Sequence, residues 1–131
     1  MDYHIRWKQR FSNFKKAKEQ LTEFIEKGEL NKFEIQGLIK CFEYTFELAW
    51  KTMKDYLEME GFNVKSPRSA IKTAFQVQLI SDGHTWIDAL EKRNLMAHTY
   101  DENKADEAAT LIREDYYKII NELYFKLEGL L

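Results

Sequence analysis

An arginine, an asparagine, a histidine and a tyrosine lie within eight consecutive residues, RNLMAHTY, at positions 93–100. The guanidinium of Arg93 is planar and permanently charged, and it suits a phosphate group. An imidazole such as that of His98 exchanges protons near neutral pH and can act as a general acid or base. Together they could cleave an RNA phosphodiester without a metal: Arg93 would stabilise the developing charge and His98 would move a proton.

The spacing of Arg93 and His98 constrains the structure around them. On a straight α-helix, residues five apart are rotated by about 140° from one another, so the two side chains would diverge. The polar segment 98–103 (HTYDEN) indicates that the helix ends between them. We therefore expect His98 at or just past a helix C-terminus, with Tyr100 in the following connection.

The composition predicts long helices around this segment. A chain of 131 residues suits one domain, residues 1–131, with one continuous core. A hydrophobic fraction of 44% and an aromatic fraction of 15% argue against disorder. One proline and five glycines favour helices over a turn-rich β fold.

Capping signals and apolar spacing predict five helices. The start signals are Asn31 with Glu34 as a capping box, Ser66 with Pro67, and Asp106, which we expect to help cap the last helix. The expected helices cover residues 3–27, 31–60, 66–79, 84–96 and from about 103 to the end. Phe75 and Leu130 are among the residues expected to face the core. The predicted fold is an all-α, up-and-down antiparallel bundle of four long helices plus a shorter one.

The second predicted helix carries more than one apolar line. Besides its main stripe it holds Cys41, Tyr44, Leu48 and Trp50. A helix apolar over so much of its circumference needs neighbours on several sides, which favours a two-fold homodimer. Cys41 is the single cysteine, so no internal disulfide forms and a buried thiol is expected.

Charge and hydropathy limit the possible functions. The net charge of −2 gives no general attraction to nucleic acid, so any RNA contact must be local. No apolar run reaches the length of a membrane span or resembles a signal peptide, and we expect a soluble, cytoplasmic protein. No metal-ligand spacing such as His-x3-His is present, and we expect neither a metal nor a cofactor.

The extended motif and most of the chain resemble one family. Arg-x4–6-His alone is a weak signal, but Arg93, Asn94, His98 and Tyr100 in this register resemble the HEPN superfamily. The form Arg-x4-His-x-Tyr is similar to HEPN toxins encoded beside a minimal nucleotidyltransferase antitoxin. Residues 42–61, 66–75 and 86–102 also resemble the nucleotidyltransferase substrate-binding proteins.

This resemblance implies two alternative functions. In the first, the protein is a metal-independent RNase toxin with Arg93 and His98 as the catalytic pair, Asn94 supporting them and two motifs meeting in a homodimer. The partner nucleotidyltransferase would silence it by transferring AMP to Tyr100. In the second, the protein is a non-catalytic substrate-binding subunit of a two-component nucleotidyltransferase. An inert helical dimer is a third, purely structural interpretation.

Overall fold

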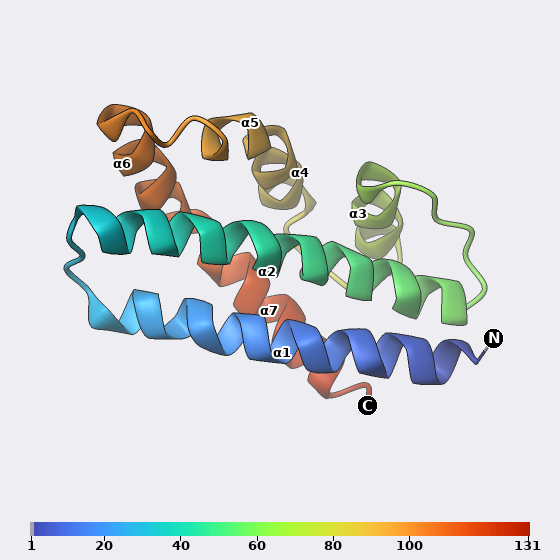
Figure 1. Ribbon diagram of the computed structural model, residues 1–131. Coiled ribbons are helices and arrows are strands. Elements are labelled where there is room, and N and C mark those ends of the chain that lie inside the picture. Colours follow the sequence, from blue (N-terminus) through green and yellow to red (C-terminus); the bar gives the residue numbers. More distant parts are fainter. Residues whose placement is uncertain (1) are drawn as a thin grey trace.

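Two long helices, α1 (Tyr3–Lys27) and α2 (Lys32–Met59), lie side by side in opposite directions (Figure 1). The computed structural model describes residues 2–131. The capping box predicted at the start of α2 is confirmed: the Asn31 side chain accepts from the Glu34 N–H, and the Glu34 carboxylate accepts from the Asn31 N–H, both at 2.9 Å. The side chain of Asp2, which the sequence analysis did not identify, caps α1.

The end of α2 depends on a glycine. Gly61 has a φ of 97°, in the left-handed region that glycine adopts without strain. The N–H groups of Gly61 and Phe62 donate to the carbonyls of Glu58 and Leu57, so the last turn of α2 keeps its hydrogen bonds. The end of the second helix near residue 60, which the sequence analysis predicted, is confirmed.

The middle of the chain forms three short helices: α3 (Pro67–Gln76), α4 (Gly83–Glu91) and α5 (Arg93–Met96). The predicted helix over residues 66–79 is too long, because α3 stops at Gln76 and Gln78 has a φ of 64°. The predicted helix over residues 84–96 is divided at Lys92. The all-α class is confirmed, but these segments form three short helices where we expected one long helix and a shorter one.

The last part of the chain is one continuous helical segment with a π turn in it. It consists of α6 (Glu102–Leu111), the π-helix η1 (Ile112–Tyr116) and α7 (Tyr117–Glu128). Asp101 caps its start by accepting from the N–H groups of Asn103 and Lys104, so the prediction that Asp106 does so is wrong. The segment descends behind the α1–α2 pair (Figure 1).

The helices enclose one cluster of buried hydrophobic side chains. In it the Phe42 ring stacks on Tyr116 with centroids 5.4 Å apart. Cys41 is buried as predicted, and burial raises the pKa of its thiol. Phe75 and Leu130 are exposed by 53% and 41%, so their predicted burial is wrong. Within residues 2–131, no helix combines the length and apolar character needed to cross a membrane.

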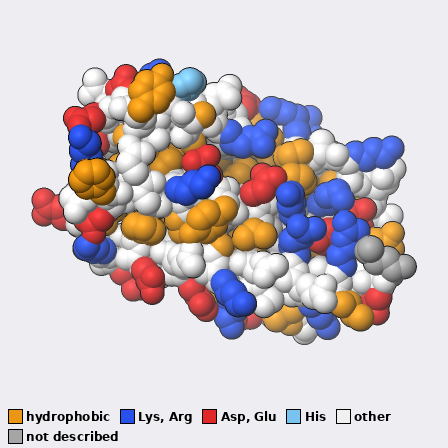
Figure 2. Space-filling view, in the orientation of Figure 1, with side chains coloured by type: hydrophobic (Ala, Val, Ile, Leu, Met, Phe, Trp, Pro, Cys, Tyr) orange, Lys and Arg blue, Asp and Glu red, His pale blue; other side chains and the backbone are white. Residues whose placement is uncertain are grey.

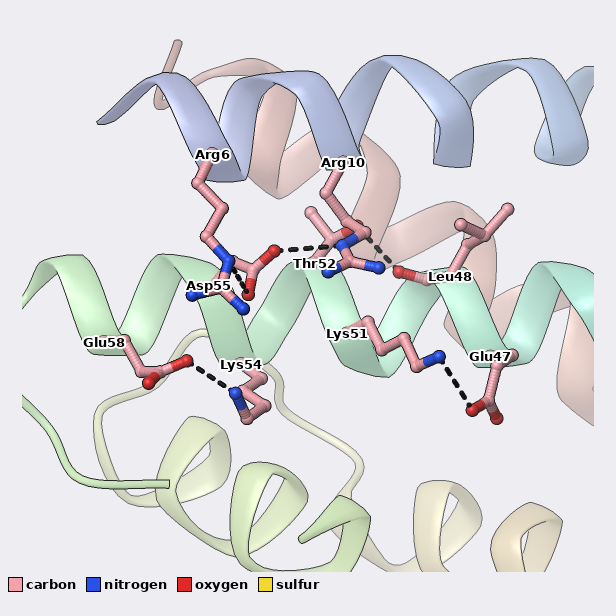
Figure 3. A network of polar contacts seen from close by, with 9 residues as sticks. All are labelled: Arg6, Arg10, Glu47, Leu48, Lys51, Thr52, Lys54, Asp55 and Glu58. Atoms are coloured by element: carbon pink, nitrogen blue, oxygen red, sulfur yellow. Dashed lines mark hydrogen bonds and ion pairs between the residues drawn. The ribbon is translucent and has the colours of Figure 1, made fainter. Parts of the chain in front are cut away.

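A charged side chain joins α1 to α2 inside this core. Asp55 is 1% exposed, and both of its carboxylate oxygens are paired with arginines from α1 (Figure 3). Arg6 Nε lies 3.4 Å from Oδ1, and Arg10 Nε donates to Oδ2 at 3.0 Å. The carboxylate thus fixes the α1–α2 pair at the end of the molecule where α1 begins.

Candidate functional site

Arg93 begins a new helix, α5, directly after the helical segment is interrupted at Lys92. Lys92 is the C-cap of α4 and the N-cap of α5. Its N–H donates to the Asp88 carbonyl, and its carbonyl accepts from the Leu95 N–H at 2.9 Å. No proline or glycine lies at this position, and the sequence analysis did not predict the break. Its effect is that Arg93 occupies the first turn of α5 rather than the last turn of α4.

His98 lies just past the C-terminus of α5, as predicted from the sequence. The N–H of Ala97 donates to the Asn94 carbonyl, and the N–H of His98 donates to the Leu95 carbonyl, both at 3.2 Å. These are the short i→i−3 bonds of a tightened turn. Met96 is 3% exposed and anchors the turn in the core, which leaves the flanking polar side chains on the surface.

The four predicted site residues are all exposed on this turn. Tyr100 is the most open, at 82%. Arg93, Asn94 and His98 are also exposed, and no hydrogen bond or ion pair to another residue of the described chain occupies the Arg93 guanidinium. The side chain of Arg93 is therefore available to a ligand.

The structure brings these residues together as two pairs. Tyr100 Oη lies 3.5 Å from His98 Nδ1, and the rings meet edge to face with centroids 5.9 Å apart. Arg93 and Asn94 line a common pocket of about 370 Å³. No hydrogen bond joins Arg93 to His98 within the described chain.

Arg93 also reaches a second depression, of about 290 Å³, between α5 and α2. This depression is lined by Lys40, Phe42, Glu43, Tyr44, Phe46, Glu47, Arg93 and Met96. Figure 2, in the orientation of Figure 1, shows hydrophobic side chains lying among acidic and basic ones on the face turned to the viewer. The surroundings of Arg93 are therefore of mixed charge, consistent with the net charge of −2.

A side chain that the sequence analysis missed holds the turn between His98 and Tyr100. The Gln36 amide of α2 donates to the Thr99 carbonyl at 2.6 Å, and its oxygen accepts from the Thr99 hydroxyl at 3.1 Å. We call this pair of bonds the Gln36–Thr99 clamp. Because the partners are far apart in the sequence, no local pattern could reveal it.

The break before Arg93 is supported from the π turn. The hydroxyl of Tyr116 donates to Asp88 at 2.6 Å, and the second oxygen of Asp88 lies 3.2 Å from Lys92 Nζ. The hydrogen bond from Tyr116 lowers the pKa of Asp88. Burial is the main cause that raises the pKa of Tyr116, and its hydrogen bond to the Asp88 carboxylate is the second. Asp88 thus connects α4 to the last helical segment.

The chain is an all-α domain that exposes an Arg-x4-His-x-Tyr turn on its surface. Residues 9–129 match the family described as nucleotidyltransferase substrate binding protein like, and the chain belongs to this family. The resemblance seen in the sequence is thereby confirmed.

Known proteins similar to this chain carry two kinds of description. Over 76 residues the chain is 33% identical to the probable ribonuclease HepT of Haemophilus influenzae. The aligned region covers 54% of this chain and 52% of that protein. The chain thus matches about half the length of this curated relative.

Among described residues, no three His, Cys, Asp or Glu side chains are grouped as a metal site would require.

Solved structures share the fold. A protein of Thermus thermophilus superposes with a TM-score of 0.79 at 30% identity, covering 87% of this chain and 98% of that one. A Haemophilus influenzae protein described as having the fold of a nucleotidyltransferase substrate-binding domain gives a TM-score of 0.65 at 21% identity, covering 97% and 99%. The second similarity supports the fold alone.

Proposed function

We propose that this protein is a metal-independent endoribonuclease toxin whose partner is a minimal nucleotidyltransferase. The observation that carries the proposal is the exposed α5 turn, which presents Arg93, Asn94, His98 and Tyr100 with the Arg93 guanidinium unpaired. The similarity to a probable ribonuclease supports it. Its place of action is the cytoplasm, where RNA and ATP are present.

The proposed reaction uses the ribose 2′-hydroxyl of RNA as the nucleophile. The O2′–P bond forms, the P–O5′ bond breaks, and the proton of the 2′-hydroxyl is balanced by protonation of the departing O5′. His98 moves one of these protons, and Arg93 binds the phosphorane-like state, in which negative charge accumulates. Asn94, beside Arg93 in the same pocket, supports the position of the phosphate.

A site shared between two protomers is consistent with the absence of a hydrogen bond between Arg93 and His98 in one chain. A two-fold homodimer places two copies of the turn around one RNA-binding cleft, so that Arg93 of one protomer and His98 of the other can act on one phosphate. Such an interface repeats the same surface patch on both protomers. Light scattering at micromolar concentration is expected to give the mass of a dimer, and a monomer would contradict the shared cleft.

Tyr100 is the proposed regulatory site. Its hydroxyl attacks the α-phosphate of ATP in the partner's active site, pyrophosphate leaves, and the phenol proton is released. The bound AMP places a negative charge two residues from His98, where it blocks RNA and attracts the arginine. The 82% exposure of Tyr100 gives a second enzyme access to the hydroxyl.

Replacing Tyr100 by phenylalanine is therefore expected to uncouple the toxin from its partner. With the nucleotidyltransferase and ATP present, the wild-type chain gains AMP by mass spectrometry and loses cleavage activity. The Tyr100→Phe variant gains no AMP and remains active. Modification of Tyr100→Phe at another residue would show that Tyr100 is not the acceptor.

A non-catalytic substrate-binding subunit is the second candidate function. Asp101 and Glu102 directly follow Tyr100 and weaken the attraction of RNA to this turn. The family description also supports this interpretation. Arg93 and His98 would then bind a phosphate, or the partner, without turnover.

Cleavage of a labelled RNA pool in EDTA separates these two functions. The wild-type chain, confirmed free of AMP by mass spectrometry, is expected to cleave the RNA, and the Arg93→Ala/His98→Ala variant is expected to leave it intact. If both proteins leave the RNA intact, the binding-subunit function replaces the proposed one. If both cleave equally, the activity belongs to a contaminant.

A further inference from the structure

The pocket that holds Arg93 and Asn94 contains a second arginine from another helix. It lies between the first turn of α3 and the α4–α5 break and has a volume of about 370 Å³. Arg68 of α3 lines it together with Arg93 and Asn94, and Glu91 is the acidic residue among its walls. Two guanidinium groups therefore border one open space.

Arg68 is held in place by the start of α3. Pro67 occupies the first helical turn, and the Ser66 hydroxyl oxygen accepts from the Ser69 N–H at 3.1 Å. The backbone that carries Arg68 is thus fixed, while its side chain is 50% exposed. An arginine on a rigid turn loses less freedom on binding an anion than one on a mobile loop.

The carboxylate nearest to Arg68 is only loosely paired with it. Arg68 Nη2 and Glu91 Oε1 are 3.7 Å apart, and the side chains are 50% and 60% exposed. An exposed ion pair of this length contributes little to stability. A phosphodiester, whose two free oxygens match the guanidinium fork, can displace the Glu91 carboxylate from Arg68.

The charges that face the pocket favour an anion. Its lining residues include the two positive charges of Arg68 and Arg93 against the single negative charge of Glu91, and Asn94 adds a neutral donor. The protein as a whole carries a net charge of −2, so contact with RNA requires a local site of this kind.

We propose that this pocket binds a phosphodiester of single-stranded RNA next to the one held by Arg93, with Arg68 as the binding group. The inference rests on RNA as the substrate of the proposed function. Glu91 competes for Arg68 in the free protein. Arg68 holds the strand and takes no part in the bond changes, which remain with Arg93 and His98.

Fluorescence anisotropy with a short labelled single-stranded RNA tests this proposal, using His98→Ala as the background so that the probe stays intact. Adding Arg68→Ala is expected to weaken binding roughly tenfold. The slope of log affinity against log salt should become shallower by about 0.7, the value for one lost phosphate contact on a single strand. Adding Glu91→Gln is expected to strengthen binding two- to three-fold, or roughly 0.5 kcal/mol.

Arg113→Ala is the matched control, because it removes an exposed arginine that binds the Gly28 carbonyl on another part of the surface. If Arg68→Ala and Arg113→Ala give the same affinity and salt slope, the subsite is overturned. Thermal unfolding of the Arg68→Ala chain shows whether its fold is intact. If ATP binding depends on Arg68 and RNA binding does not, the assignment of the pocket to RNA is likewise overturned.

Cleavage assays separate this subsite from the proposed function. In the wild-type background, Arg68→Ala is expected to raise KM and leave kcat nearly unchanged, as for a group that only binds. RNA binding that depends on Arg68, in a chain that never cleaves, would support the subsite and overturn the RNase function. Cleavage that is indifferent to Arg68 would overturn the subsite and leave the RNase function standing.

Discussion

The His98→Ala variant is expected to cleave RNA more slowly than the wild-type chain by a factor of about 10² to 10⁴, the usual contribution of a general acid or base. His98 is exposed, and its side chain has one long contact, to Tyr100 at 3.5 Å, so its removal leaves the bundle intact. Single-turnover rate constants measured at saturating protein report the chemical step directly.

The matched control for this variant is His84→Ala, which removes an exposed histidine from the start of α4. It is expected to cleave at the wild-type rate. A His98→Ala chain that retains the wild-type rate would show that His98 moves no proton in the rate-limiting step. Equal losses in both variants would indicate a change of fold rather than of chemistry.

The Asp55→Ala variant is expected to lose about 2–3 kcal/mol of unfolding free energy. Removing one partner of a buried pair typically costs about 3–5 kcal/mol, because the other charge is left uncompensated. Here the side chains of Arg6 and Arg10 are 35% and 31% exposed and can turn to water, so we expect a smaller loss. Urea unfolding followed by circular dichroism measures it.

Glu58→Ala provides the comparison within the same network (Figure 3). Glu58 pairs with Lys54 at 2.7 Å one turn away on α2, and both side chains are partly exposed. Such a helical pair contributes about 0.3–0.5 kcal/mol, well below the loss expected for Asp55. Equal losses in the two variants would contradict the structural role that we assign to the buried carboxylate.

Local signals predicted the parts of the fold that depend on neighbouring residues. The capping box of Asn31 with Glu34, the Ser66–Pro67 start and the stop at Gly61 all act within a few positions, and all are present in the structure. The break at Lys92 is supported by Asp88 and by Tyr116, which reaches it from a π turn late in the chain. The spacing of apolar residues along the sequence cannot predict such a contact between distant residues.

The site was predictable to the same extent. The register of Arg93, Asn94, His98 and Tyr100 identified the turn and placed His98 past a helix end, as the structure shows. Arg68 was assigned no role from the sequence, because nothing in it indicated that α3 and α5 border one pocket. The Gln36–Thr99 clamp was missed for the same reason: its partners meet only after the helices have packed.

The Gln36–Thr99 clamp also determines how the turn opens. Both bonds lie at the surface, and each contributes about 0.5–1.5 kcal/mol net. Residues 98–101 can therefore detach and reclose many times while α1 and α2 stay folded, as an independent unit of low local stability. Amide hydrogens there are expected to exchange far sooner than those around Asp55. An enzyme that binds Tyr100 in an extended segment would thus reach it while the rest of the protein stays folded.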